Sequence, residues 1–280
     1  MTTPPIAVTG STGVVGGHVA SALAEAGVTQ RLLVRTPAKA PVLPNTTVHP
    51  FSYSDRSAST AALEGVEVLF MVSAAESAVR LDEHRAFVDS AGAAGVKHIV
   101  YTSFFGASPT ATFTLARDHD VTEKYIVASG IAHTFLRDNL YIDFMNELVG
   151  EDGVIRGPAG DGRASIIARE DIARVASTVL LDPSSHVNAT YDLTGREALT
   201  LHEVAAILTE HRGTLVTYHN ESIPEAYESR ARYGAPAWQN DAWVSTYTAI
   251  AAGEAERVST AVADITGVEP LTLAEFLAKG

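Results

Sequence analysis

The sequence of 280 residues contains no cysteine. This absence excludes disulfide bonds, thiol nucleophiles and iron–sulfur ligation, and it fits a reducing compartment. The sequence also lacks any apolar run near the roughly 18 residues needed to cross a membrane. Its first residues show neither the basic segment nor the long apolar stretch of a signal peptide. We therefore expect a cytoplasmic protein with no membrane segment.

Basic residues are scarce, since 20 Lys and Arg stand against 33 Asp and Glu and the formal net charge is −13. Nothing in the sequence resembles a basic patch, so direct nucleic-acid binding is not expected. The ten histidines include no pair spaced four residues apart, and neither a Walker loop nor a G-x-S-x-G motif occurs. We therefore expect no metal site, no phosphate-binding loop of the nucleoside-triphosphatase type and no serine hydrolase active site.

Apolar residues are abundant at 46% of the chain, enough for a sizeable core. Short apolar runs alternate with helical patterns from the N-terminus onward. The predicted strands are 6–9, 31–35, 47–51, 66–72, 98–102 and 133–137, and later 165–168 and 190–193. Helices are predicted between these strands. The first begins after Gly13, and the others cover 59–63, 82–94, 117–129 and 171–181. Repeated β–α units predict an α/β fold with a Rossmann-type, doubly wound parallel sheet.

The rhythm of strands and helices loosens in the second half of the chain. We predict a dinucleotide-binding domain over 1–150, to which 164–195 returns, and a smaller, more helical substrate lobe mainly within 151–280. Two capping boxes, at 200–203 and 272–275, mark helix starts. The stretch 222–252 is expected to be largely helical and carries both tryptophans.

The turn after the first strand, G-S-T-G-V-V-G, is the strongest functional signal. Gly10 permits a tight turn, Gly13 lets backbone N–H groups approach a pyrophosphate, and Gly16 lets the helix pack closely on the strand. The helix N-terminus then favours the phosphate charge. The alternative is a glycine-rich turn without a ligand. The residues expected to contact the dinucleotide here are Thr9, Gly10, Ser11, Thr12, Gly13, Val14, Val15 and Gly16, although the hydroxyls are equally consistent with plain turn residues.

The end of the second strand points to the type of dinucleotide. NAD sites usually place an acid there for the ribose 2′-hydroxyl, whereas a basic residue suits the 2′-phosphate of NADP. Arg35 stands at this position, Lys39 follows, and no acid occurs between residues 31 and 54. We expect NADP(H) in preference to NAD(H). A solvated arginine at a strand end is the alternative.

Ligands of open α/β sheets bind beyond the carboxyl ends of the strands. Ser73 and Ala74 follow the fourth strand, and their small side chains would let a cofactor pass near the backbone. Asp55 either contacts the adenine or caps the next helix. Thr102 and Ser103 end the fifth strand and are expected to flank the nicotinamide.

The next residues are candidates for the substrate side. Phe104 and Phe105 follow the fifth strand as a possible apolar wall, although such aromatic pairs are more often core. Beyond the sixth strand, Asn139, Tyr141 and Phe144 form a candidate substrate wall, and a hinge between lobes is the alternative.

The chain has four lysines, and none has a tyrosine four residues before it. Lys124 lies on the helix between the fifth and sixth strands, where short-chain dehydrogenases carry the lysine that bonds the nicotinamide ribose. The tyrosine acid–base of those enzymes is replaced by Asp120. Their usual alcohol–ketone chemistry is therefore not expected. Lys124 as an ordinary surface lysine is the alternative.

Several motifs together resemble the NmrA-like family of atypical short-chain dehydrogenases, over nearly the whole chain. They are V-T-G-S-T-G-V-V-G-G-H-V, L-L-V-R-T-P-A-K-A, the Y-T-S strand end, T-E-K-Y, L-R-D-N-L-Y and the D-G-R-A-S-I-I-A-R-E-D-I-A segment at 161–173. Within the family the resemblance is strongest to bacterial NADPH-dependent quinone oxidoreductases and triphenylmethane dye reductases. It implies NADP(H) bound by the three glycines and Arg35, a nicotinamide ribose contact from Lys124, and Asn139 and Tyr141 facing the substrate.

Two functions fit these observations. One is an NADPH-dependent reductase of quinone-like or other conjugated acceptors, with Lys124, Asn139 and Tyr141 as catalytic candidates. Such an acceptor takes its proton from water, so the missing tyrosine matters less. The other is a non-catalytic NADP(H)-binding sensor that regulates a protein partner, as some members of the family do. Trp238, Trp243 and Phe144 would then form an exposed patch instead of enclosing a pocket. We favour the enzyme and expect an apolar substrate and possible homodimers.

Overall fold

The computed structural model describes residues 5–279, which fold as two compact units. Unit 1 comprises residues 5–103, 118–137 and 170–191, and unit 2 comprises 104–117, 138–169 and 192–279. The segments 104–117 and 138–150 thus fall in unit 2, whereas the expected bounds had placed them in the dinucleotide domain. The returning segment is 170–191, slightly shorter than the expected 164–195.

The sheet centred on unit 1 has seven strands in the order β3-β2-β1-β4-β5-β6-β9. These strands are β1 Ile6–Thr9, β2 Gln30–Val34, β3 Thr46–Pro50, β4 Val68–Met71, β5 His98–Phe104, β6 Ala132–Asp138 and β9 Ala189–Leu193. The strand order reverses between β1 and β4, both of which pair in parallel with their neighbours. This is the doubly wound arrangement that the sequence predicted, and its switch point lies beside the glycine turn.

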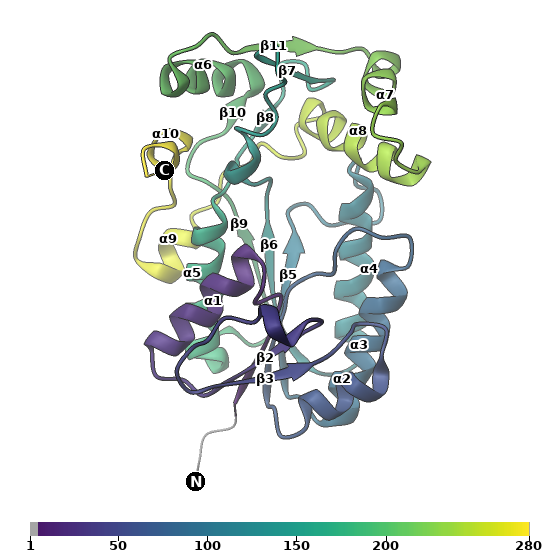
Figure 1. Cartoon of the computed structure of the whole chain (residues 1–280), viewed down its shortest axis with the longest axis vertical. Helices are drawn as coiled ribbons and strands as arrows, with labels where there is room; N and C mark the ends of the chain where they lie inside the picture. Colours follow the sequence, from purple (N-terminus) through teal and green to yellow (C-terminus); the bar gives the residue numbers. More distant parts are fainter. Residues whose placement is uncertain (1–4, 280) are drawn as a thin grey trace. The chain divides into compact units, whose positions relative to one another are not determined.

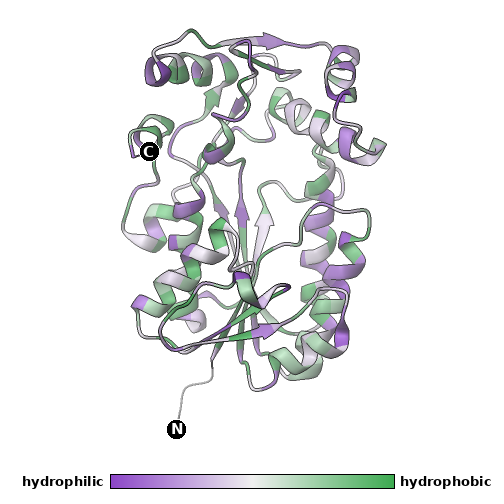
Figure 2. Cartoon of the chain, viewed as in Figure 1, coloured by the Kyte–Doolittle hydropathy of each residue, from purple (hydrophilic) through white to green (hydrophobic). Residues whose placement is uncertain are grey.

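Helices cover both faces of this sheet: α1 and α5 lie on one side, and α2, α3 and α4 lie on the other (Figure 1). Their bounds are α1 Val14–Glu25, α2 Arg56–Leu63, α3 Arg80–Ala94, α4 Thr114–Ala128 and α5 Arg169–Leu181. The helices show mixed hydrophilic and hydrophobic stretches (Figure 2), as expected of helices with one buried face. The buried side chains between sheet and helices include Leu33, Leu69, Phe87, Ile99 and Tyr101.

The structure departs from the sequence prediction at 165–168. That prediction is wrong, because the strand there, β8, covers only Arg163–Ala164. Residues 165–168 are buried, as the apolar run suggested, but their backbone bonds go to irregular segments. Ser165 N–H donates to Ala255 O at 2.9 Å, and Ile167 N–H donates to Leu140 O at 2.9 Å. Burial alone therefore does not distinguish a strand from a buried loop.

Unit 2 contains two small sheets and several helices. Strand β7 (Val154–Gly157) runs parallel to β11 (Thr217–Asn220), and β8 runs antiparallel to β10 (Leu199–Thr200). The helices are α6 Leu201–Arg212, α7 Ile223–Ala231, α8 Ala237–Ala251, α9 Ala261–Thr266 and α10 Leu273–Leu277. Both predicted capping boxes are confirmed at the starts of α6 and α10. Over the described residues, no helix combines the length and apolarity that crossing a bilayer requires.

Candidate functional site

The glycine turn of unit 1 has the geometry that its sequence suggested. Gly10 has a φ of +67°, and a Cβ there would lie 2.9 Å from the Cβ of Val72. A Cβ on Gly16 would overlap the carbonyl group of Gly10, so α1 packs against the turn at backbone distance. A Cβ on Gly13 would meet only the Gly10 oxygen, at 3.4 Å, so the space above Gly13 is open. Glycine is thus required at 10 and 16 for the fold, and at 13 it leaves room for a ligand.

Ser11 shows that the turn fits an anion. Its side chain is 3% exposed, and its Oγ has no hydrogen-bond partner among the described residues. Helix α1 begins directly after Gly13, with no side-chain cap and no acid in its first turn. An unpartnered buried hydroxyl beside free helix N–H groups suits a phosphate oxygen. Thr12 and Val14 are exposed on the same turn, and Val15 is buried against the core.

Thr9 is used within the fold. Its buried hydroxyl donates to Phe70 O at 3.2 Å and accepts from the N–H of Val72 at 2.8 Å, tying β1 to β4. The phenol of Tyr53 donates to the same hydroxyl and to Val72 O. Burial raises the pKa of Tyr53, so it stays a neutral donor. These bonds hold the switch point rigid, and a cofactor contact from Thr9 remains a prediction.

Arg35 is exposed at the end of β2 and has no hydrogen bond or ion pair within the described chain. Its guanidinium is thus available for a phosphate, as is the exposed Lys39, the last residue of a 3₁₀ turn over Pro37–Lys39. Asp55 behaves as the capping alternative predicts, because its carboxylate accepts from Ala58 N–H at 3.0 Å at the start of α2. The adenine contact of Asp55 stays a prediction.

Ala74, after β4, is held on both sides of its backbone by α3. Its N–H donates to His84 Nε2 at 2.9 Å, and its carbonyl accepts from Arg80 Nε at 3.0 Å. Next to it, the N–H of Ser73 donates to the buried hydroxyl of Thr102 at 2.8 Å. The predicted cofactor loop is therefore fixed by hydrogen bonds, not left loose.

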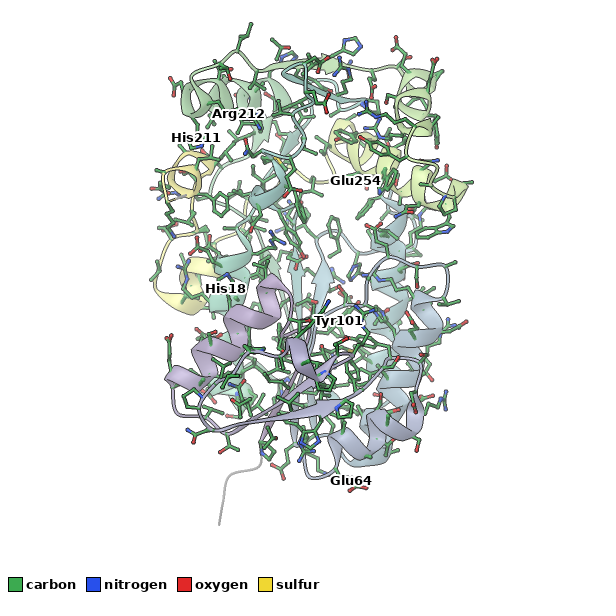
Figure 3. The ribbon with its side chains drawn as sticks, in the orientation of Figure 1. His18, Glu64, Tyr101, His211, Arg212 and Glu254 are labelled. Carbon is green, nitrogen blue, oxygen red and sulfur yellow. The ribbon has the colours of Figure 1, made fainter. Side chains whose placement is uncertain are left out.

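A buried polar chain continues from this loop towards α4. His84 Nδ1 lies 2.9 Å from the hydroxyl of Thr122, and Arg80 donates to His119 Nε2 at 3.1 Å. His119 Nδ1 lies 3.0 Å from the phenol of Tyr101. Tyr101 is fully buried, and Figure 3 labels it among the side chains of unit 1. Burial lowers the pKa of His84 to about 3 and lowers that of His119 as well, so both rings are neutral.

Ser103 and Lys124, two predicted nicotinamide-side residues, have partners on or from α4. Buried Ser103 donates to Glu123 Oε1 at 2.5 Å, and Arg137 pairs with the same carboxylate through two bonds of 2.8 and 2.5 Å. Lys124 Nζ pairs with Asp120 Oδ2 at 2.7 Å, and its side chain is 65% exposed. Asp120 thus occupies the tyrosine position and binds the lysine, and the ribose contact of Lys124 stays a prediction.

Four residues of this region were not predicted from the sequence: Arg80, His84, His119 and Glu123. A signal was present, because His84 follows Arg80 by four residues and Glu123 follows His119 by four. That spacing puts each pair on one face of its helix, and apolar residues such as Phe87 on α3 and Ile126 on α4 mark these faces as buried. Ionisable groups on a core-facing stripe must find partners, so such pairs indicate a buried polar network.

Unit 2 contains an apolar pocket of about 640 Å³, within the range of small-molecule sites. Tyr141, Phe144 and Trp243 are among its lining residues. The Tyr141 phenol donates to Asp138 Oδ2 at 3.0 Å, and the guanidinium carbon of Arg169 lies 4.7 Å from the Phe144 ring centroid. Trp243 and Phe144 therefore line a pocket, whereas Trp238 is not among its lining residues.

Asn139 and the phenylalanine pair lie outside the lining of this pocket. Asn139 is fully buried, and its amide bonds Ser165 Oγ at 2.9 Å, Ala255 O at 3.0 Å and Leu140 N–H at 2.8 Å. Every polar atom of the amide is thus taken up within unit 2. Phe105 is buried, and the ring centroids of Phe104 and Phe113 lie 4.8 Å apart. These phenylalanines line a recess much smaller than the pocket of about 640 Å³. These residues act as core, and their predicted substrate contacts stay untested.

The sheet, its switch point and the phosphate-ready turn define a Rossmann-type dinucleotide-binding protein, and unit 2 adds a pocket of small-molecule size. The chain belongs to the NmrA-like family, whose model matches residues 2–269. The resemblance inferred from the motifs is thereby confirmed.

Its relatives include several reductases. It is 38% identical over 240 residues to quinone oxidoreductase 2 of Escherichia coli, covering 82% of each chain. The structure of that protein with NADPH superposes with a TM-score of 0.89 over 98% of this chain and 99% of the other. An NAD(P)H azoreductase of Xenophilus azovorans is 32% identical over 97% and 96% of the two chains. The Citrobacter sp. triphenylmethane reductase with NADP(H) is 31% identical, with a TM-score of 0.87 over 98% and 99%.

Proposed function

We propose that this protein transfers hydride from NADPH to a quinone-like or other conjugated small molecule bound in the unit 2 pocket. The chain is an NAD(P)H-dependent oxidoreductase of the NmrA-like family, and its dinucleotide is NADP(H). The observation that carries the choice of acceptor is the pocket itself. Its volume of about 640 Å³ and its aromatic walls suit one flat ring system of moderate size.

The residues of unit 1 hold the dinucleotide. The N–H groups at the start of α1 and the unpartnered Ser11 hydroxyl take the pyrophosphate, and Arg35 takes the 2′-phosphate. Lys124 and the ends of β4 and β5 belong to the nicotinamide side. Bound NADPH supplies the hydride, and the protein contributes binding and orientation.

The residues of unit 2 hold the acceptor. The rings of Tyr141, Phe144 and Trp243 offer stacking faces among walls that are mainly apolar. The bond from Tyr141 to the Asp138 carboxylate fixes the phenol in place. The reduced acceptor takes its proton from water, so a tyrosine acid is not needed. The sensor alternative expects Trp243 and Phe144 in an exposed patch, and their place in the pocket lining favours the reductase instead.

The test measures NADPH oxidation with a panel of quinones and conjugated dyes. We expect turnover above background, and we expect Trp243→Ala to lower kcat/KM about tenfold through loss of ring contacts. Trp238→Ala removes the same side chain outside the pocket lining and should leave kcat/KM near the wild-type value. If no acceptor of the panel is turned over, the proposal is wrong.

A further inference from the structure

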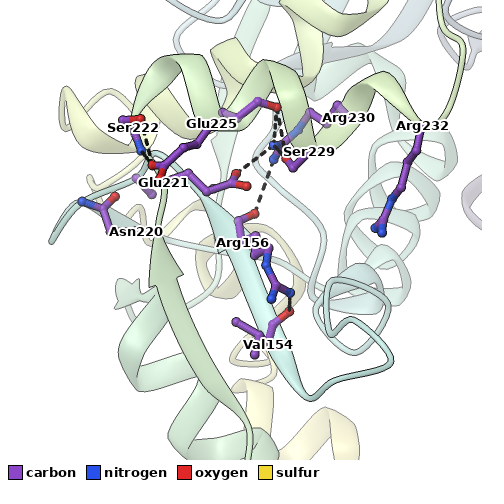
Figure 4. A network of polar contacts seen from close by, with 12 residues as sticks. Val154, Arg156, Asn220, Glu221, Ser222, Glu225, Ser229, Arg230 and Arg232 are labelled. Atoms are coloured by element: carbon purple, nitrogen blue, oxygen red, sulfur yellow. Dashed lines mark hydrogen bonds and ion pairs between the residues drawn. The ribbon is translucent and has the colours of Figure 1, made fainter.

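Three arginines line the unit 2 pocket, although its walls are otherwise mainly apolar. Arg156 comes from β7, Arg230 from α7, and Arg232 from the residue that ends α7. Figure 4 shows Arg156 beside Arg230, and the Arg232 side chain extending separately from the end of the helix. A cation in the wall of an apolar pocket is unfavourable unless it has a partner. The role of each arginine therefore depends on what its guanidinium contacts.

Two of these guanidinium groups are already neutralised. Arg230 pairs with Glu221 at 2.9 Å, and both side chains are almost completely buried. Its guanidinium carbon also lies 5.0 Å from the ring centroid of Tyr247. Arg156 forms two bonds with Asp152, of 3.0 and 2.5 Å. These pairs build the pocket wall and leave little positive charge for a ligand.

Arg232 differs from the other two because it has no ion pair within the described chain. One of its terminal nitrogens donates to the Tyr233 hydroxyl at 2.9 Å, and its guanidinium carbon lies 5.0 Å from the Tyr233 ring centroid. The Tyr233 ring in turn packs edge to face on the Trp243 ring, with the two ring centroids 5.8 Å apart. A guanidinium has five N–H donors, so most donors of Arg232 remain available beside an aromatic wall.

One carboxylate also lines the pocket. Glu147 is exposed, has no side-chain partner within the described chain, and comes from the segment that follows Phe144. It opposes an anion by charge, whereas Arg232 attracts one. Screening limits each charge to about 8 Å at physiological ionic strength, so the net charge of −13 has little effect inside the pocket. The two unpaired charges of the lining, Arg232 and Glu147, therefore matter most for a bound ligand, and only Arg232 can donate hydrogen bonds to an anion.

We propose that the pocket selects acceptors that carry an anionic oxygen group, carboxylate or sulfonate, on the conjugated ring, and that Arg232 binds this group. The ring lies against the aromatic walls, and two parallel N–H···O bonds from the guanidinium hold the anion. That the bound molecule accepts hydride rests on the proposed function. Binding of the anionic group depends on the pocket alone and is tested by binding measurements.

The test uses redox-inert probes that differ only in charge. Calorimetry compares 2-naphthoate with 2-naphthamide, and naphthalene-2-sulfonate with its sulfonamide, on the full-length protein. We expect the anion to bind about tenfold tighter than its amide, as one charge-assisted contact allows. The preference should shrink as salt is raised.

Variants test whether Arg232 causes the preference for anions over amides. Arg232→Gln should abolish the anion preference, and Arg232→Lys should retain part of it, because lysine keeps the charge but not the paired bonds. Glu147→Gln should increase the preference. Arg196→Gln is the matched control, because this arginine pairs with Glu275 and is not among the lining residues. It should leave both affinities unchanged.

The inference is overturned if the wild-type protein binds each anion and its amide equally. It is also overturned if Arg232→Gln weakens anion and amide by the same factor, because the residue then only packs. NADPH turnover of uncharged quinones is measured separately. Failure there counts against the proposed function alone, since the naphthalene probes accept no hydride.

Discussion

At the scale of single residues, we propose that Arg35 governs the choice between two dinucleotides that differ by one phosphate. Its guanidinium is exposed and unpaired within the described chain, and the neighbouring segment carries no acid. The 2′-phosphate adds about two negative charges, which an arginine meets with paired N–H donors. We therefore expect the Arg35 side chain to affect the binding of NADPH strongly and that of NADH little.

We predict that Arg35→Gln weakens NADPH binding about tenfold and changes NADH binding little, as the loss of one partly solvated charge-assisted contact implies. Fluorescence titration or calorimetry with both dinucleotides measures the ratio. Arg31→Gln is unsuitable as a control, because Arg31 bonds the carbonyls of Ala62 and Glu64. Arg85→Gln, on the exposed side of α3, serves instead. An unchanged ratio of NADPH to NADH affinity in Arg35→Gln would contradict the assigned role.

His84 links the protonation of one ring to the stability of the whole protein. Burial first, and the Arg80 charge second, lower its pKa from 6.5 to about 3. Between these values the unfolded chain binds a proton that the folded chain excludes. The contribution of His84 to stability is thus complete above pH 6.5 and decreases as the pH falls towards 3.

We predict that the free energy of unfolding of the wild-type protein falls between pH 6.5 and 5, by up to about 1.4 kcal/mol per pH unit for each such histidine. Urea titrations followed by circular dichroism at several pH values measure this slope. His84→Gln keeps a polar side chain but cannot titrate, so its slope should be smaller by up to one proton. His18→Gln, an exposed histidine on α1, is the control. Equal slopes for wild type and His84→Gln would show that the ring titrates normally.

At the scale of elements, the contact between α1 and the glycine turn depends on the absence of one carbon atom. A Cβ on Gly16 would overlap backbone atoms of Gly10, which no rotamer change can relieve. A Cβ on Gly92, on the exposed side of α3, would have only Ile131 Cδ1 nearby, at an ordinary contact distance of 3.8 Å. We therefore expect a glycine-to-alanine substitution to have opposite effects on the stability of these two helices.

We predict that Gly16→Ala destabilises the protein by about 2 kcal/mol or more and prevents NADPH binding, because α1 must move away from β1. Gly92→Ala should be neutral or stabilise by up to about 1 kcal/mol, since alanine favours helix and lowers the entropy of the unfolded chain. Urea unfolding and NADPH titration of both variants provide the comparison. Normal binding by Gly16→Ala would rule out the close-packing role.

Elements with a local cause were predictable from the sequence. The sheet strands follow from apolar runs, and the starts of α6 and α10 follow from capping boxes whose bonds the structure contains. The pocket of unit 2 was not predictable. Its arginines come from β7 and α7, more than seventy residues apart, and they meet only because β7 pairs with β11. Parallel pairing of two short strands leaves little trace in local sequence.

At the scale of the whole molecule, the chain alternates between the two units. Three segments of each unit follow one another, so the chain passes from one unit to the other five times. Strands β5, β6 and β9 begin in unit 1 and end with residues assigned to unit 2. Neither unit is a continuous piece of chain, and unfolding of one removes the ends of strands in the other. We therefore expect a single cooperative unfolding transition.

This coupling has a measurable consequence, because both tryptophans lie in unit 2 and the dinucleotide turn lies in unit 1. A ligand that binds only the folded protein stabilises it by about 2.7 kcal/mol at a hundred times its Kd. We predict that NADP⁺ at this concentration raises the midpoint of thermal unfolding by about 5 °C. Tryptophan fluorescence and circular dichroism should report the same shift, although the fluorescent residues are not in the unit that holds the turn. In Ser11→Ala, which lacks the unpartnered hydroxyl, the shift should be smaller by both probes. A fluorescence transition that stays in place while the dichroism transition moves would mean that the two units unfold independently.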